Sequence, residues 1–465
     1  MTPGARLSAA IEVLAEIEAQ RRPATDALKA WGLARRFAGS GDRAAIAGLV
    51  YDALRRKASA AFLMGGDRPR NLVLGMLRLE RKLDVEAIAR LCDGAGHSPA
   101  PLEAPERAAL ESGTREGAER ESAERESAAL AGAPPWIAGD YPEWLDPHLA
   151  KVFGAQRAEE GAALASRAPL DLRVNALKAD RARVEAALAH LGAAPSRWSA
   201  LGLRIVLEAD AKNPAIHAEP AFIKGLVEVQ DEGSQLAALF ADARPGHHVI
   251  DLCAGAGGKT LALAAIMQNQ GQIYATDSDK RRLAPIHARV ARAGARNIQI
   301  LTPKGVGDAL ADLDGRADRV LIDAPCTGIG AWRRNPDAKW RMRPGALEIR
   351  VQEQAALLDR AVGLIKPGGR IVYVTCSLLA EENNDQVRGF LARHPDFIAM
   401  PGAELTRPLG ERAMVFGRAA LMTAEGLLMT PRRTETDGFF VSTLMRRAEA
   451  STVRPQSTET TVTEW

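Results

Sequence analysis

The sequence predicts an α/β protein whose largest part is a doubly wound, mostly parallel sheet, with an all-helical segment and a small α+β module before it. Between residues 228 and 447, strand-like runs alternate with helical stretches, which is the pattern of a doubly wound sheet. Within residues 1–92, apolar residues recur at three- and four-residue spacing, which indicates a helical bundle.

The strand-like runs of the predicted sheet are short and apolar. They cover residues 247–253, 271–277, 297–302, 318–325 and 369–377. Two further runs, residues 426–434 and 438–447, are expected to close the sheet as an antiparallel pair.

Changes in composition divide the chain further. Residues 93–135 consist mainly of Ala, Glu, Arg, Ser, Gly and Pro, with the pentamer AERES twice in tandem, and are predicted to form a low-complexity linker. Two strand-like runs flank a helical one within residues 136–227, which fits a small α+β module. The tail, residues 448–465, is rich in Thr, Ser and Glu and is predicted to be disordered.

The overall composition indicates a soluble protein, with 46% apolar and 26% charged residues. No run of about 18 uncharged apolar residues is present, and the start of the chain has acids where a signal peptide has an apolar core. We therefore expect a cytoplasmic protein with no membrane partner, and we expect it to be a monomer.

The cysteines and the charges limit the choice of partners. Cys92, Cys253, Cys326 and Cys376 lie far apart, with no CxxC pair and no histidine cluster beside them, so neither a disulfide framework nor a metal site is expected. The first 100 residues carry 16 Lys and Arg against 11 Asp and Glu. That excess fits either phosphate binding or a solvated helix face.

A glycine-rich turn, DLCAGAGGKT, ends one predicted strand and opens a helix. Glycines there let the backbone approach a ligand closely, and Asp277 ends the next strand at the spacing of an acid that binds a ribose. A plain structural turn or a nicotinamide dehydrogenase are the alternatives, but Gly255, Gly257 and Gly258 depart from the G-x-G-x-x-G fingerprint. S-adenosylmethionine, which has no phosphate, fits this turn better. The predicted cofactor contacts are Cys253, Ala254, Gly255, Ala256, Gly257, Gly258, Lys259, Asp277 and Asp323.

Two cysteines follow the last two predicted parallel strands. Cys326 comes after Asp323-Ala324-Pro325, and Cys376 comes directly after the strand that ends at Thr375. Either thiol alone could be a small buried hydrophobe. Because the carboxyl ends of parallel strands meet at one edge of the sheet, both thiols and Asp323 are expected to converge beside the glycine turn.

These segments together resemble the RsmB/Nop/Sun family of RNA cytosine carbon-5 methyltransferases, with a match from Trp136 to Arg447. The resemblance is carried by GLVEVQDEGSQLAALF, DLCAGAGGKT, ATDSDKRRL, DAPCTGIGAWRRNPDAKW, VYVTCSLLAEENNDQV and TPRRTETDGFF. The start of the chain, with RAAIAGLVYDALRR and PRNLVLGMLRL, is similar to the NusB-like RNA-binding domain of family members that act on ribosomal RNA.

The resemblance implies a Rossmann-like class I methyltransferase domain, a ferredoxin-like RNA-binding module, S-adenosylmethionine as cofactor and RNA as substrate. By the family pattern, Cys376 is the nucleophile that attacks carbon 6 of cytosine, Cys326 assists product release, and Asp323 holds the base. Trp332, Arg333 and Arg334 follow the Cys326 loop and are candidates for base stacking and phosphate contact, although Trp332 could equally be a packing residue.

The sequence leaves alternatives for the RNA substrate and for the role of the protein. Ribosomal RNA is favoured as substrate over transfer RNA by the NusB-like start alone, and a non-catalytic RNA-binding assembly factor is disfavoured because both thiols and Asp323 are present. The family usually has an acid after the third strand that holds the adenine amino group, whereas no carboxylate lies between Arg296 and Asp308. Thr302 or a backbone carbonyl is expected to replace it.

Overall fold

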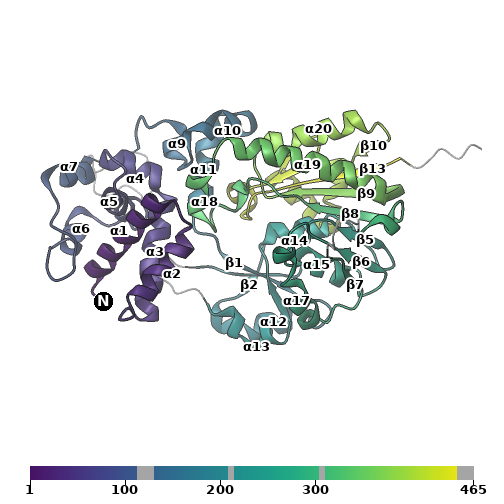
Figure 1. The fold of residues 1–465 in the computed structure, drawn as a ribbon, viewed down its shortest axis with the longest axis horizontal. Helices are drawn as coiled ribbons and strands as arrows, with labels where there is room; N and C mark the ends of the chain where they lie inside the picture. The colour runs from purple at the N-terminus through teal and green to yellow at the C-terminus, as the bar shows by residue number, and fades with distance from the viewer. Residues whose placement is uncertain (113–129, 208–213, 303–308, 448–465) are drawn as a thin grey trace, which may run out of the picture.

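The computed structural model describes residues 1–112, 130–207, 214–302 and 309–447. Three units follow one another: a helical unit at the amino end, a small four-stranded sheet, and a large sheet with helices on both faces (Figure 1). The AERES repeats and the predicted disordered tail lie outside the described residues.

The helical unit has the predicted all-α character, and the starts of α1 and α6 are capped by side chains. The Thr2 side chain accepts a hydrogen bond from the Ala5 amide and Pro3 occupies the first turn of α1, while Asp84 caps α6. The inward faces of these helices form one apolar core. The helices are α1 (Pro3–Gln20), α2 (Ala24–Ala34), α3 (Ser40–Arg55), α4 (Lys57–Met64), α5 (Pro69–Leu79), α6 (Val85–Leu91) and α7 (Ala104–Ser112).

Helix α7 extends this unit into the stretch predicted as linker, so that prediction requires a correction. The Leu110 side chain is fully buried in the helical core, and Glu106 forms an ion pair with Arg70 of α5 at 2.7 Å. A single large apolar residue on a helix of small and charged residues is a weak sequence signal, which is why composition alone indicated a linker.

The small module has the strand and helix order of a ferredoxin-like fold, as expected. Its antiparallel sheet has the order β2-β3-β1-β4, and one helix follows β1 while the other precedes β4. Leu172, Val184, Leu203 and Val227 form its fully buried core. The elements are β1 (Leu170–Val174), α12 (Arg181–Ala187), β2 (Ala194–Pro195), β3 (Gly202–Ile205), α13 (Pro220–Ile223) and β4 (Val227–Val229).

The helices before β1 belong with the large sheet, although the sequence assigned residues 136–165 to the small module. Tyr141, Leu149 and Leu164 are buried in the same apolar core as Ile322 and Tyr373 of the large sheet. Local periodicity shows that a helix has an apolar face but not which sheet that face contacts. The helices are α9 (Pro135–Ala138), α10 (Asp146–Phe153) and α11 (Arg157–Ala165).

The large sheet is doubly wound and mostly parallel, as predicted. In the described residues the order is β11-β12-β13-β9-β8-β5-β6-β7, with β10 paired to β13. Strands β9, β8, β5, β6 and β7 are parallel, and the antiparallel β12 and β13 close one side as expected. The strands are β5 (His248–Asp251), β6 (Gln272–Ala275), β7 (Ile298–Ile300), β8 (Ala317–Asp323), β9 (Ile365–Thr375), β10 (Phe397–Ala399), β11 (Leu421–Met422), β12 (Leu427–Met429) and β13 (Phe439–Arg446).

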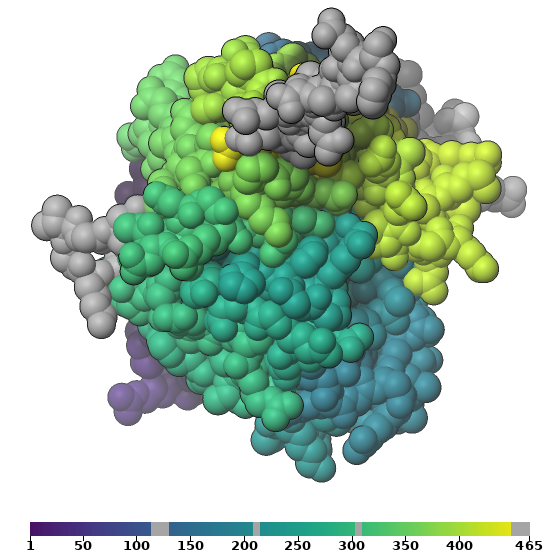
Figure 2. Space-filling view, turned by 90° about the vertical axis from the view of Figure 1, so that its right-hand side faces the viewer, coloured from purple at the N-terminus to yellow at the C-terminus, as the bar shows by residue number. Residues whose placement is uncertain are grey.

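Helices cover both faces of this sheet. Residues of α10, α11, α19 (Gly345–Leu364) and α20 (Asn384–Arg393) pack against one face, and residues of α14 (Glu232–Leu239), α15 (Gly258–Ile266) and α22 (Ala413–Ala419) pack against the other. Figure 2 shows the small module in blue to teal beside the lower part of the large unit, with the purple helical unit mostly behind it. Within the described ranges, no helix is long and apolar enough to cross a membrane.

Candidate active site

Three adjacent parallel strands deliver the predicted site residues to one edge of the sheet. Strand β8 lies between β5 and β9, and all three run in the same direction. Asp251 ends β5, Asp323 ends β8, and Cys376 directly follows Thr375 at the end of β9. The predicted convergence of the thiols with the glycine turn therefore follows from the order of the strands.

The two thiols are in direct contact. The Cys326 and Cys376 sulfur atoms lie 3.4 Å apart, and both residues are partly exposed. The hydrogen bond with Cys376 and burial raise the pKa of the Cys326 thiol well above its usual range. A protonated Cys326 can therefore donate its S–H to the Cys376 sulfur.

Glu382 fixes the loop that carries Cys326, a role that sequence reasoning missed. Its carboxylate is fully buried and accepts hydrogen bonds from the Thr327 amide at 2.8 Å, the Thr327 hydroxyl at 2.5 Å and the Gln354 amide nitrogen at 3.1 Å. Gln354 also donates to the Pro325 carbonyl at 3.0 Å. The motif VYVTCSLLAEENNDQV contains this acid, but only the fold brings it to the Cys326 loop.

The next residue holds the Cys376 loop in the same way. Asn383 accepts a hydrogen bond from the Thr375 hydroxyl at 2.6 Å and donates to the Ser377 carbonyl at 2.9 Å. Both flanks of Cys376 are thereby tied to the segment that holds Cys326, so the geometry of the thiol pair is set by one short stretch of chain.

Lys259 and Asp323 form an ion pair near the thiols. The Lys259 ammonium donates to Asp323 Oδ2 at 2.8 Å and lies 5.0 Å from the centre of the Phe439 ring. The Lys259 side chain is 7% exposed, whereas that of Asp323 is 35% exposed. Within the described part of the chain, Asp323 Oδ1 has no hydrogen-bond partner, so it is open to a ligand.

The glycine turn has the conformation that its composition predicts. Gly255 and Gly257 have φ angles of 50° and 84°, in the left-handed region that favours glycine. A Cβ on Gly257 would lie 2.5 Å from a side-chain carbon of Ile286, whereas a Cβ on Gly255 would have its nearest neighbour at 3.8 Å. Gly257 is therefore required for packing, and Gly255 leaves open space at the turn.

Asp277 is buried beside this turn. Its carboxylate is 2% exposed and accepts hydrogen bonds from the Gly255 and Asp279 amides, each at 2.9 Å. The structure thus gives Asp277 a loop-ordering role that the spacing did not indicate. A carboxylate has further acceptor positions, so these bonds leave room for a ligand hydroxyl.

The remaining predicted cofactor residues line the same turn through their backbones. The Ala254 amide donates to the Thr276 carbonyl at 2.9 Å, and the Ala256 carbonyl accepts a hydrogen bond from Arg289 at 2.8 Å. Gly258 begins α15. Burial and the neighbouring carboxylates raise the pKa of Cys253, so this third thiol of the region stays protonated.

Asp251, beneath the turn, carries an unused acceptor. Its Oδ2 accepts from the Thr260 hydroxyl at 2.7 Å, while its Oδ1 is buried without a hydrogen-bond partner in the described residues. Burial, followed by the charge of Asp323, raises the pKa of Asp251 to about 7. A free acceptor, an open glycine turn and the Asp277 carboxylate together fit the amino and hydroxyl groups of a nucleoside.

Of the three candidates for RNA contact, the structure places Trp332 and Arg333 in buried positions, whereas Arg334 is partly exposed. The Trp332 ring is 2% exposed and packs in the core of the α/β unit. Arg333 and Arg334 both pair with Asp231 and Asp437, at distances from 2.5 to 3.3 Å. These carboxylates, about 100 residues away in sequence on either side, neutralise the arginines and hold them in the fold.

Two further predictions concern other positions. The family's acid that holds the adenine amino group would follow β7. Most of that stretch, residues 303–308, lies outside the described residues. The expected replacement of this acid by Thr302 or a backbone carbonyl therefore stays a prediction. In the described part of the chain, no group of three or more His, Cys, Asp or Glu is placed to hold a metal ion.

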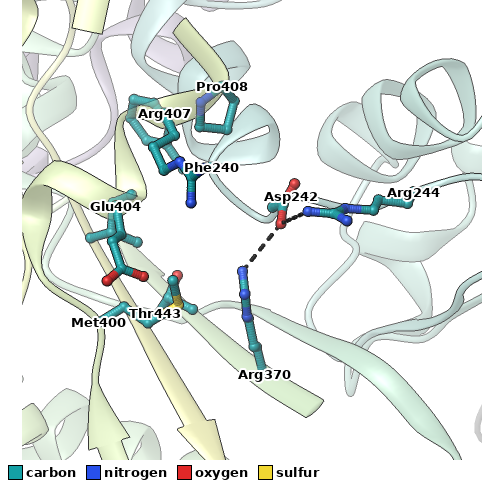
Figure 3. A pocket seen from close by; sticks show the side chains of 10 residues that line it. Phe240, Asp242, Arg244, Arg370, Met400, Glu404, Arg407, Pro408 and Thr443 are labelled. Atoms are coloured by element: carbon teal, nitrogen blue, oxygen red, sulfur yellow. Dashed lines mark hydrogen bonds and ion pairs between the residues drawn. The ribbon is translucent and has the colours of Figure 1, made fainter. Parts of the chain in front are cut away.

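A separate pocket of about 280 Å³ lies by the opposite strand ends. Figure 3 shows Arg244 and Arg370 directed at Asp242, which lies before β5, with Glu404 and Arg407 facing them across the cavity. Since Asp242 precedes β5 and Asp251 ends it, this pocket is not part of the candidate site.

Comparisons with known proteins assign the chain to a family. Residues 238–445 match the family model described as 16S rRNA methyltransferase RsmB/F. A relative from Synechocystis, "Probable ribosomal RNA small subunit methyltransferase B", is 35% identical over 313 residues, which cover 66% of this chain and 67% of that protein. The chain belongs to the RsmB/F family. Relatives of this name from Salmonella strains match over 50% of their length, also at 35% identity.

Two solved structures are similar to this chain. The crystal structure of PH0851 is 25% identical, with a TM-score of 0.65, and the match covers 96% of this chain and 99% of that one. A methyltransferase homolog protein from Pyrococcus horikoshii is 27% identical, with a TM-score of 0.54 and coverage of 67% and 97%. The chain is an S-adenosylmethionine-dependent methyltransferase, as the glycine turn and the family resemblance predicted.

Proposed function

We propose that this RsmB/F protein methylates carbon 5 of a cytosine in ribosomal RNA, with Cys376 as nucleophile and Cys326 as the thiol that completes the cycle. The observation that carries the proposal is the contact of the two sulfur atoms at 3.4 Å, at the ends of adjacent parallel strands. Two thiols that served only to pack the core would be fully buried, whereas these are partly exposed and lie near a charged Lys–Asp pair.

The first step requires a sulfur nucleophile. Carbon 5 of cytosine is a weak nucleophile, and addition of the Cys376 thiolate to carbon 6 moves the electrons of the 5,6 double bond towards carbon 5 and the ring nitrogens. N3 takes up a proton from solvent in this step and releases it again when the product forms. The S–H of Cys326, which its raised pKa keeps in place, stabilises the Cys376 thiolate before the attack.

Asp323 is suited to hold the base during this addition. Its Oδ1 is open to the exocyclic amine, and its negative charge favours the proton at N3. Lys259 anchors the other oxygen at 2.8 Å, which fixes the direction of the carboxylate.

The last step returns the enzyme to its starting state. After methylation, carbon 5 carries both a proton and the new methyl group; Cys326 removes the proton, the 5,6 double bond forms again, and the bond between Cys376 and carbon 6 breaks. Once the Cys376 sulfur is bound to carbon, the hydrogen bond that raised the Cys326 pKa is lost. Cys326 is then able to ionise and act as the base.

The glycine turn and its neighbours would hold the cofactor. S-adenosylmethionine supplies an electrophilic methyl group when bound. The residues that fit it are the turn from Cys253 to Lys259, the Asp277 carboxylate for the ribose, and the free Asp251 oxygen for an amino group. Lys259, at the end of this turn, donates to Asp323 and so links the cofactor region to the base site.

Ribosomal RNA is the substrate that the relatives support, because those with matching sequences are called ribosomal RNA small subunit methyltransferase B. The target cytosine must leave its stack to reach two thiols, which costs a few kcal/mol and favours single-stranded or loop RNA. Transfer RNA is the alternative substrate for the same chemistry.

Methyl transfer to defined RNAs tests the proposal. Purified protein is incubated with S-adenosylmethionine and either unmodified small-subunit ribosomal RNA or transfer RNA, and 5-methylcytosine is mapped by bisulfite sequencing. We expect a single modified cytosine in the ribosomal RNA and none with the Cys376→Ala variant. Methylation of transfer RNA alone, or of a position other than carbon 5, would contradict the proposal.

A further inference from the structure

A groove of about 570 Å³ lies where the helical unit meets the segment that follows the Cys326 loop. Helices α1 and α5 and the start of α4 form one wall, and α18 (Pro336–Arg341) with the residues after it forms the other. Figure 1 shows α18 between the helical unit and the large sheet. The groove is distinct from the thiol site but joined to it by one short stretch of chain.

Basic side chains dominate the rim of this groove. Arg21, Lys57, Arg341 and Arg343 line it, against the acidic Glu18 and Asp337. Arg341 is neutralised by Asp337 at 2.9 Å. Among the residues that the structure describes, Arg21, Lys57 and Arg343 form no ion pair, and Arg21 and Arg343 are exposed. The rim therefore carries unpaired positive charge that an anionic partner could neutralise.

The floor of the groove is apolar. Leu14, Ile17 and Leu72 are less than 10% exposed, and Trp340 is half-buried beside them. A charged rim over an apolar and aromatic floor matches a chain of phosphates that carries flat bases. A purely acidic peptide has no apolar or aromatic group that would pack against this floor.

Buried contacts hold the two walls in a fixed relation. The Lys339 ammonium is 2% exposed and donates to the Arg55 carbonyl at 2.8 Å and the Asp140 carbonyl at 2.6 Å. The Trp340 indole donates to the Leu54 carbonyl at 2.6 Å, and Asp337 accepts from the Ala24 amide at 3.2 Å. The groove is thus preformed, and binding there requires no rearrangement of its walls.

The groove is also close to the candidate active site along the chain. Pro336, at the start of α18, follows Cys326 by ten residues. The Arg333 carbonyl, between the two, accepts a hydrogen bond from Arg55 of the helical unit at 3.2 Å. This hydrogen bond fixes the groove relative to the Cys326 loop.

We propose that this groove holds a single-stranded stretch of the RNA substrate flanking the target cytosine, with phosphates at Arg21, Lys57 and Arg343. The inference rests on the proposed function and adds to it the path of the RNA and the three side chains that hold it. Exposed cations at fixed positions on a rigid wall set the register of a strand, while the thiol site selects the base.

The salt dependence of RNA binding tests this path. A double variant, Arg21→Gln with Arg343→Gln, removes two positive charges from the exposed rim, and Arg418→Gln on α22 is the control, since Arg418 is exposed, forms no ion pair in the described residues and lies outside the groove. Affinity for a fluorescent fragment of small-subunit ribosomal RNA is measured over a range of salt concentrations. Thermal unfolding of each variant verifies the fold.

Each phosphate contact on a single strand contributes about 0.7 to the slope of log affinity against log salt. The double variant should therefore have a slope lower by about 1.4, a higher KM for RNA and an unchanged kcat at saturating RNA, while the control matches the unsubstituted protein. An unchanged slope, or the same change in the control, would overturn the groove proposal even when the unsubstituted protein methylates the RNA. Absence of methylation by the unsubstituted protein would instead count against the proposed function.

Discussion

Replacing Arg333 with methionine should destabilise the protein strongly without affecting contact with RNA. The Arg333 side chain is 4% exposed and lies between Asp231 and Asp437, which are 7% and 4% exposed. In Arg333→Met the two buried carboxylates share the single remaining cation, Arg334. The variant therefore tests whether this arginine belongs to the fold or to the RNA interface.

The magnitude follows from the burial of the group. Removal of one partner from a buried ion pair costs about 3–5 kcal/mol, and we expect the lower end because Arg334 remains in place. Burial and Asp231 already raise the pKa of Asp437 to about 6. Loss of Arg333 raises this pKa further, so Asp437 takes up a proton below that pH and the destabilisation should shrink as the pH falls.

Urea denaturation measures this loss, with Arg350→Met as the matched control. The Arg350–Glu353 pair is about 40% exposed, so its removal should change the free energy of unfolding by less than about 1 kcal/mol. Below the unfolding transition, Arg333→Met should bind RNA with the salt dependence of the unsubstituted protein. Near-normal stability together with a lower salt slope would refute our reasoning and restore Arg333 as a phosphate contact.

Three further predictions concern the cofactor region. Because the folded-state pKa of Asp251 is raised to about 7, its contribution to stability is complete below about pH 4 and is lost as the pH rises through 7. Between about pH 5 and pH 8, the free energy of unfolding should therefore fall less in Asp251→Asn than in the unsubstituted protein, as measured by denaturation without cofactor. Asp277→Ala should weaken S-adenosylmethionine binding by more than about 1 kcal/mol in calorimetry, and unchanged affinity would contradict the assigned role. Gly257→Ala should cost about 1–3 kcal/mol more stability than Gly255→Ala, because only the former places a Cβ against Ile286; equal losses would contradict this.

The parts of the site that follow from strand order could be predicted from the sequence. Cys326 and Cys376 each come after a recognisable apolar strand, and the carboxyl ends of parallel strands meet at one edge. The glycine turn needs no tertiary information either, since its left-handed residues are glycines in the sequence. Periodicity also indicated the helical character of the start of the chain and the α+β character of the small module.

Features that depend on distant partners could not be predicted. Arg333 and Arg334 appeared available for RNA because the sequence does not reveal that Asp231 and Asp437 meet them in space. Glu382 was overlooked for the converse reason, since an acid on a polar stretch gives no sign that it will be fully buried against the Cys326 loop.

The sequence also did not reveal which part of the fold each helix packs against. Residues 136–165 have an apolar face, but nothing in that periodicity distinguishes the small sheet from the large one. Helix α7 was similarly missed because Leu110 is its single fully buried side chain.

Trapping of the covalent intermediate tests the central claim most directly, because the two thiols are assigned to opposite halves of one cycle. Cys326→Ala allows attack and methyl transfer but impairs elimination, so with S-adenosylmethionine and RNA it should accumulate a protein–RNA complex that survives denaturing electrophoresis. Cys376→Ala should give neither this complex nor methylated RNA. A trapped complex with Cys376→Ala in place of Cys326→Ala would reverse the two roles, and methylation that persists in both variants without any complex would contradict covalent catalysis by this pair.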